Sequence, residues 1–434
     1  MISKNYAKQF LLFHIFILLY VLSYPVREKA LVVIALLLIA FLLCFLEYKR
    51  SKQFVSPLLW FYTFWIIISV VARVDMHVYE LNSTWNTNLM AVVTISSVSF
   101  FGFYLLSDNY IRRIKTSSNQ EKVIWNSLCD YVLICSLCIS ICFYMINVIA
   151  CNGVPQLSSN IDYHRRIFVH TLFFVPVNLG RYAFSFVPVL LKNSISNKRK
   201  YVVIVLTSLI LVCEALTGWR TYVFQSVIML VSSQMVLISA TSKKEEIKSF
   251  RRTVGLSLSA LVFIGYVAAT RGRLTSIKRI IEYTFQTIYL YFAPSFLNFQ
   301  TTMSIVVPKG YLFYTLECIW SLWISPDNMP GFENLNANIG AFNVGTYLLQ
   351  PYADLGILGV VFWNSIIACV SVWSYSKAKS QSNLLGFVGL GVCNNVIFTM
   401  HNGFFLRSSS ILVWVIMGII YQKISIYQGR MIRV

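Results

Sequence analysis

The side chains of this sequence best suited to chemistry are those of five arginines. These arginines lie outside the short segments that hold most of the Lys and Arg. They are Arg165, Arg166, Arg220, Arg271 and Arg273. Paired guanidinium groups offer the planar N–H donors that suit phosphate and diphosphate oxygens, so we interpret these arginines as an anion site. For Arg220 and for the Arg165–Arg166 pair, the alternative is a side chain that anchors its segment at a membrane interface.

Arg181 differs from these arginines because it lies in the middle of an apolar segment, residues 171–191, which Pro176, Gly180 and Pro188 interrupt. A charge at that depth needs a cavity or an acidic partner. Glu214, near the end of the next apolar segment, is the nearest candidate partner. Two interpretations stay open: a structural Arg–Glu pair, or a Glu214 that accepts a proton from a hydroxyl group.

The composition identifies the elements that must position these side chains. The 434 residues are 57% hydrophobic and 12% charged, and the mean hydropathy is +0.67; soluble domains have roughly 25% charged residues. The sequence therefore predicts an all-α polytopic membrane protein. A net charge of +20 could indicate nucleic-acid binding, but here the basic residues fall in short loops between apolar segments, which argues against nucleic acid as a partner.

About twelve apolar segments have bilayer length. They are residues 10–24, 30–45, 55–71, 89–106, 128–150, 171–191, 201–216, 222–240, 254–269, 355–372, 384–400 and 411–421. When the loops are assigned alternately to the two sides of the membrane, one side holds most of the 36 Lys and Arg residues. This predicts that the side rich in Lys and Arg is cytoplasmic and that both termini lie there. The arginines of the proposed anion site then lie on the opposite, external face.

The chain is expected to be one integral membrane domain, residues 1–434, with one large external loop, residues 271–354. This loop is too apolar to be disordered. Residues 277–292 show the spacing of an interfacial helix, and residues 311–324 are too short to span and suit a re-entrant or interfacial helix. Residues 325–343 are rich in turn residues. Two interpretations stay open: their Asn side chains with nearby Trp and Tyr suit sugar binding, or the segment is a surface loop with an aromatic belt at the membrane interface.

Three segments of the chain carry a resemblance to a known family. Residues 343–359, Asn-Val-Gly-Thr-Tyr-Leu-Leu-Gln-Pro-Tyr-Ala-Asp-Leu-Gly-Ile-Leu-Gly, resemble the segment that marks O-antigen and capsular polysaccharide polymerases, the Wzy family. Residues 216–221 resemble that family's Gly-x-Arg hairpin, although Trp219 stands where a small residue is more usual. Residues 153–168 are similar to its external loop with a trailing Arg.

This resemblance implies a glycosyltransferase that uses neither a metal nor a cofactor and acts at the external face of a bacterial cytoplasmic membrane, facing the periplasm. The donor would be a glycan on undecaprenyl diphosphate, and the acceptor a new lipid-linked repeat unit. Besides membrane lipid and this substrate, a chain-length regulator protein is an expected partner. The five His without paired spacing and the scarce carboxylates also argue against a bound metal.

The resemblance also implies roles for particular residues. Those expected to bind the diphosphate are Arg220, Arg271 and Arg273, then Arg165, Arg166 and Arg181. The candidates for the general base are Glu214, His164, His401 and Asp354. Those expected to bind glycan are Asn343, Tyr347, Tyr352 and Asp354. For Asp354 a further alternative is an N-cap of the helix that follows, since Asp is common in that position.

Two other functions fit the same features. An O-antigen ligase would share the chemistry and the large external loop but use another acceptor. A lipid-linked oligosaccharide flippase would also face a diphosphate with basic residues, but such transporters usually show two similar halves, which this sequence lacks.

Overall fold

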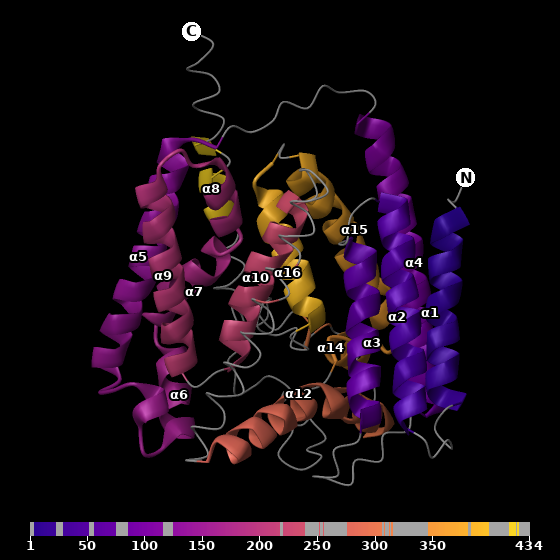
Figure 1. Ribbon diagram of the computed structural model, residues 1–434. Helices are drawn as coiled ribbons and strands as arrows, with labels where there is room; N and C mark the ends of the chain where they lie inside the picture. The colour runs from indigo at the N-terminus through magenta and orange to yellow at the C-terminus, as the bar shows by residue number, and fades with distance from the viewer. Residues whose placement is uncertain are drawn as a thin grey trace. The chain divides into compact units, whose positions relative to one another are not determined.

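The part of the chain that the structure describes is entirely helical. The computed structural model describes residues 4–22, 29–51, 56–74, 86–115, 125–217, 220–238, 251, 255, 276–305, 308, 312, 314–315, 346–380, 383–398, 416–421 and 423–424. All regular elements within these ranges are helices and none is a strand (Figure 1). The all-α fold predicted from the apolar segments is confirmed for these residues.

The chain divides into two compact units, and the first consists of Met1–Ser117, Phe285–Trp373 and Val396–Arg407. Its helices are α1 (Lys4–Leu22), α2 (Lys29–Ser51), α3 (Pro57–Val74), α4 (Thr87–Lys115), most of α12 (Ile277–Ile305), α14 (Leu349–Leu355), most of α15 (Ile357–Ser380) and the end of α16 (Leu385–Phe398). Helices α1 to α4 run side by side (Figure 1). Aromatic rings fill the space between them; the Phe61 and Phe100 rings, for example, stack with centroids 4.2 Å apart.

The second unit consists of Ser118–Thr284, Ser374–Asn395 and Ser408–Val434. It contains α5 (Ser127–Ala150), the 3-10 helix η1 (Pro155–Leu157), α6 (Ile161–His170), α7 (Phe174–Ala183), α8 (Val187–Asn193), α9 (Asn197–Leu216), α10 (Arg220–Ile238) and most of α16. Helix α5 packs along both α7 and α9, and α10 contacts α7, α8 and α9. These contacts build the part of the molecule that holds Arg181 and Glu214.

Several of the described helices can cross a membrane. Four are long and apolar enough: Ala30–Lys49, Thr87–Ile111, Ser127–Ala150 and Ile357–Ser380. Counting the bent pair α7 and α8 as one span makes up to five. The predicted membrane character is supported, whereas the count of twelve spans stays a prediction. The segment 254–269 lies almost wholly outside the described residues, and of segment 411–421 the described end, 416–421, is helical.

The sixth predicted segment is broken, as its prolines and glycine indicate. It forms α7 and α8, which are bent by 44° relative to each other. Pro188 lies in the first turn of α8, where its missing N–H costs no helical hydrogen bond. A new helix can begin at this proline more easily than the old one can continue through it.

Helix α12 corrects the length of the predicted interfacial helix. A helix was expected over residues 277–292, whereas α12 continues to Ile305 and has 29 residues. The added part buries Ala293, Ser295 and Phe299, so packing extends the helix beyond the predicted end. Despite its length, α12 is not among the described helices apolar enough to span a membrane.

Candidate functional site

The predicted pairing of Arg181 with Glu214 is confirmed. Arg181, on α7, donates from Nε to Oε1 of Glu214, on α9, over 3.1 Å. The two residues are 4% and 1% exposed. A charge pair this deeply buried is costly to create, and it persists only where geometry and further hydrogen bonds compensate for the lost hydration.

Helix α10 supplies two of those further contacts. Ser226 donates from Oγ to Oε2 of Glu214 over 2.6 Å, and the Arg181 guanidinium lies 4.1 Å from the centroid of the Tyr222 ring. Tyr222 and Ser226 are four residues apart, which places them on one face of α10. We call Arg181, Glu214, Tyr222 and Ser226 the buried cluster.

Sequence reasoning did not identify Tyr222 and Ser226 as site residues. They belong to a segment interpreted only as a membrane span, in which Tyr and Ser are ordinary residues. The i, i+4 spacing directly after Arg220 was the available signal, but spacing alone does not show which neighbouring helix a face meets.

Some polar atoms near the buried cluster lack partners. Within the described residues, Arg181 Nη2, Asn178 Oδ1 and both side-chain amide atoms of Gln225 are buried without a hydrogen-bond partner. Asn178 lies three residues before Arg181, on the same face of α7. Gln225 lies three residues after Tyr222, on α10. Buried polar atoms are normally satisfied, so Arg181 keeps a donor free for another group.

Helix α7 can bring Arg181 to its partners because it lies very close to α5. A Cβ atom placed on Gly180 would lie 2.5 Å from Ser140 Oγ, a distance that real contacts do not reach. Ser140 also donates to the backbone oxygen of Val177 over 2.7 Å. The glycine next to Arg181 therefore permits the close helix crossing that fixes the position of the arginine backbone.

The chain turns sharply directly after α5. Asn152 and Gly153 have positive φ angles of 55° and 144°, and Asn147 donates to the backbone oxygen of Phe168 over 2.8 Å. His164 and Arg165 lie on α6 and are half-buried. Their expected roles in base chemistry and diphosphate binding stay predictions.

The remaining external candidates are described only in part. Arg166 lies on α6 and Arg220 begins α10, but their side chains lie outside the description. Arg271, Arg273, Asn343 and His401 lie outside the described residues altogether. Whether these residues gather around the buried cluster therefore stays a prediction.

Asp354 has a structural role. It belongs to residues 346–359, the described part of the segment that resembles the polymerase family. Asp354 is 1% exposed, and its carboxylate accepts the backbone N–H groups of Tyr314, over 2.9 Å, and Thr315, over 2.7 Å. The alternative of an N-cap is wrong, because Asp354 lies within α14 and clamps a remote turn instead. These two consecutive backbone N–H groups therefore occupy both oxygens of the Asp354 carboxylate.

Two glycines shape the junction after Asp354. Gly356 ends α14 with φ of 59° and ψ of −138°, a backbone conformation that side chains disfavour. A Cβ atom on Gly359 would overlap the Pro351 backbone oxygen. The Gly-x-x-Gly spacing in this segment thus permits the tight step from α14 to α15.

The two tyrosines expected to bind glycan have different surroundings. Tyr347 is fully buried and donates to Asn364 Oδ1 over 2.9 Å, with Ser96 Oγ 3.3 Å from its hydroxyl. Tyr352 is half-buried, and its ring meets that of Phe299 edge to face at 5.8 Å. Tyr352 is therefore the better placed of the two for contact with a ligand.

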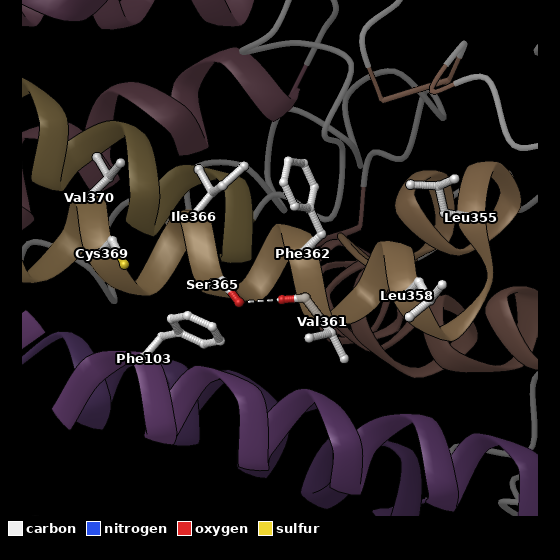
Figure 2. A pocket seen from close by; sticks show the side chains of 9 residues that line it. All are labelled: Phe103, Leu355, Leu358, Val361, Phe362, Ser365, Ile366, Cys369 and Val370. Atoms are coloured by element: carbon white, nitrogen blue, oxygen red, sulfur yellow. Dashed lines mark hydrogen bonds between the residues drawn. The ribbon is translucent and has the colours of Figure 1, made fainter. Parts of the chain in front are cut away.

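An apolar groove of about 740 Å³ runs along α15 (Figure 2). Its walls are the side chains of Phe103, Leu355, Leu358, Val361, Phe362, Ser365, Ile366, Cys369 and Val370. Phe103 of α4 faces the α15 side chains (Figure 2). The Ser365 hydroxyl donates a hydrogen bond to the Val361 backbone oxygen over 2.6 Å (Figure 2). Leu358 and Phe362 are 74% and 50% exposed, as expected for a surface that faces lipid.

The geometry offers a buried ion pair with an unpartnered arginine donor, a carboxylate clamp at α14 and an apolar groove on α15. Any assignment of a family rests on the quoted segments. No protein-family model, no curated protein and no solved structure matches this chain.

Proposed function

We propose that the chain polymerises undecaprenyl-diphosphate-linked oligosaccharide repeat units into O-antigen or capsular polysaccharide. The observation that carries this proposal is the buried Arg181–Glu214 pair, at 3.1 Å. Ionisable residues at such depth are costly and commonly mark a pathway or a reaction site. The family-like segments at residues 153–168, 216–221 and 343–359 supply the kind of reaction.

In the proposed topology the chain spans the bacterial cytoplasmic membrane about twelve times, with both termini in the cytoplasm. The four apolar spans and the bent pair support a polytopic arrangement. The large loop, residues 271–354, lies on the periplasmic side, and α12 lies at the membrane interface there. The lipid carrier then reaches the site within the outer leaflet, where a chain-length regulator is an expected partner.

The reaction transfers the growing glycan to the non-reducing end of a new unit. The acceptor hydroxyl oxygen attacks the anomeric carbon of the donor, the bond from that carbon to the diphosphate oxygen breaks, and the lipid diphosphate leaves with the electron pair. The hydroxyl proton passes to a general base, for which His164, His401 and Glu214 are the candidates. Guanidinium groups stabilise the charge that develops on the leaving diphosphate without a metal ion.

Deleting the gene tests the reaction class through the surface glycan. Loss of a polymerase leaves single repeat units on the final acceptor, whereas loss of a ligase leaves polymer on the lipid carrier. Loss of a flippase removes surface repeats altogether. A glycan ladder identical to wild type after deletion contradicts all three functions.

Polymerisation in vitro tests the arginines. With the purified chain in lipid nanodiscs and a lipid-linked repeat unit, Arg220→Ala and Arg271→Ala are expected to slow turnover about 100-fold, the effect of losing one charge-stabilising donor. The matched control is Arg251→Ala, because Arg251 is exposed and is predicted on the cytoplasmic side. Equal activity in all three variants would remove Arg220 and Arg271 from the site.

A further inference from the structure

Glu214 has the chemistry of a general base but not the surroundings of one. A base must reach the proton it removes, at about 2.6–3.2 Å between heavy atoms or through one water. Oε1 of Glu214 already accepts from Arg181, and Oε2 accepts from Ser226. Both oxygens of Glu214 are therefore already engaged by protein donors, which suits a structural carboxylate better than one that accepts a proton from a substrate.

The backbone oxygen of Glu214, like its carboxylate, accepts a hydrogen bond from a side chain. Thr217 donates from Oγ1 to the Glu214 backbone oxygen over 2.6 Å, in the last turn of α9. Residue 214 therefore presents its side chain from a fixed point near the helix end. Such rigidity suits a group that orients a neighbour better than a base that must approach a substrate.

Arg181 is the neighbour that Glu214 orients. Its Nε donates a hydrogen bond to Glu214, and its Cζ lies over the Tyr222 ring, 4.1 Å from the ring centroid. These two contacts restrict the position and the direction of the group, because a guanidinium is rigid and planar. In the described structure its Nη2 is buried without a partner, so this nitrogen is the donor that the arrangement leaves available.

We propose that Glu214 is a positioning residue, and that with Ser226 and Tyr222 it holds Arg181 so that Nη2 donates to an oxygen of the lipid-linked substrate. This inference rests on the proposed polymerase function and assigns the proton transfer to a residue other than Glu214. Because the ion pair is formally neutral, Arg181 contributes a directed donor rather than an uncompensated positive charge. Its geometry matters more than its charge.

The test is polymerisation by the full-length chain in nanodiscs, with kcat, KM and the pH profile measured for Glu214→Gln and Arg181→Lys. Glutamine keeps an oxygen that can accept from Arg181 Nε, so Glu214→Gln is expected to retain kcat within about tenfold of wild type, with an unchanged pH profile. Lysine keeps the charge but loses the rigid fork, so Arg181→Lys is expected to lose about 100-fold in kcat.

A loss of 10²- to 10⁴-fold in Glu214→Gln, with the unfolding temperature retained, is the effect expected of a missing general base and would overturn the inference. Full activity in Arg181→Lys would also overturn it. Wild-type protein that makes no polymer from the lipid-linked unit contradicts the proposed function itself, and this inference with it.

A second pair of variants covers the case in which Glu214→Gln fails to fold. Ser226→Ala removes only the hydroxyl that holds Oε2 of Glu214, and Ser226→Thr keeps that hydroxyl. We expect Ser226→Ala to lower kcat about tenfold with KM within twofold of wild type, and Ser226→Thr to restore kcat. Wild-type kcat in Ser226→Ala would contradict the positioning role.

Discussion

The buried ion pair makes a quantitative prediction about stability. Replacing Glu214 by Leu removes the acceptor of Arg181 Nε and that of Ser226 Oγ, and leaves a buried positive charge without compensation. Breaking a buried pair by removing one partner costs about 3–5 kcal/mol. Taking about 4 kcal/mol, the equilibrium constant for unfolding rises roughly a thousandfold in Glu214→Leu.

The double variant separates this pair from general packing. Arg181→Met together with Glu214→Leu removes both charges and keeps similar side-chain volumes, and such replacements are often neutral or stabilising. We therefore expect the double variant to recover most of the stability lost in Glu214→Leu. The coupling energy between Arg181 and Glu214 is obtained from wild type, Arg181→Met, Glu214→Leu and the double variant. It should be at least about 2 kcal/mol.

Reversible unfolding in mixed detergent micelles, followed by fluorescence, measures each of the four proteins. The matched control is the Arg199–Asp130 pair, which has the same 3.1 Å separation but an Arg side chain that is 27% exposed. Its coupling should be clearly smaller, because solvent screens an exposed partner. A coupling at Arg181–Glu214 no larger than that of the control would refute the reasoning.

Substitutions at three further positions, Gly180, Asp354 and Gly356, test the packing around the described sites. Gly180→Ala is expected to destabilise by about 1–3 kcal/mol through overpacking against α5, whereas Gly102→Ala, whose added Cβ meets nothing within 4 Å, should be neutral or slightly stabilising in the same thermal unfolding assay. Asp354→Asn leaves one backbone N–H facing an amide N–H and should cost about 1–3 kcal/mol; an unchanged unfolding temperature would contradict the clamp. Gly356→Ala places a side chain at φ of 59° and ψ of −138°, outside the left-handed helical region, and should cost about 1–3 kcal/mol; an unchanged unfolding temperature would argue against backbone strain.

The fold features that the sequence predicted are those set by local chemistry. Pro188 lies in the first turn of α8, directly after the break from α7, and lacks the N–H that a continuous helix would need; Pro176 lies in the first turn of α7. The Arg181–Glu214 pair was predictable because two opposite charges at similar depth in neighbouring apolar segments have few other partners.

The features that the sequence did not predict depend on contacts between residues far apart in the chain. Asp354 precedes a helix, as an N-cap does, yet its carboxylate binds a turn about 40 residues earlier, which local pattern does not reveal. Tyr347 was expected to bind glycan, but Asn364 and Ser96 bury its hydroxyl. Ser226 has no distinguishing neighbour in sequence, and only the crossing of α9 and α10 brings it to Glu214.

The Arg–Glu pair also constrains how the chain enters the membrane during synthesis. In the proposed topology, the bent pair α7 and α8 reaches the insertion machinery as one span with Arg181 near its middle, which costs roughly 2.5–3.5 kcal/mol on an insertion scale. Its counterion is 33 residues later, and the Ser226 hydroxyl comes later still. The cost of Arg181 is compensated only once α9 and α10 are in place, so we expect these segments to leave the translocon as a set rather than one by one.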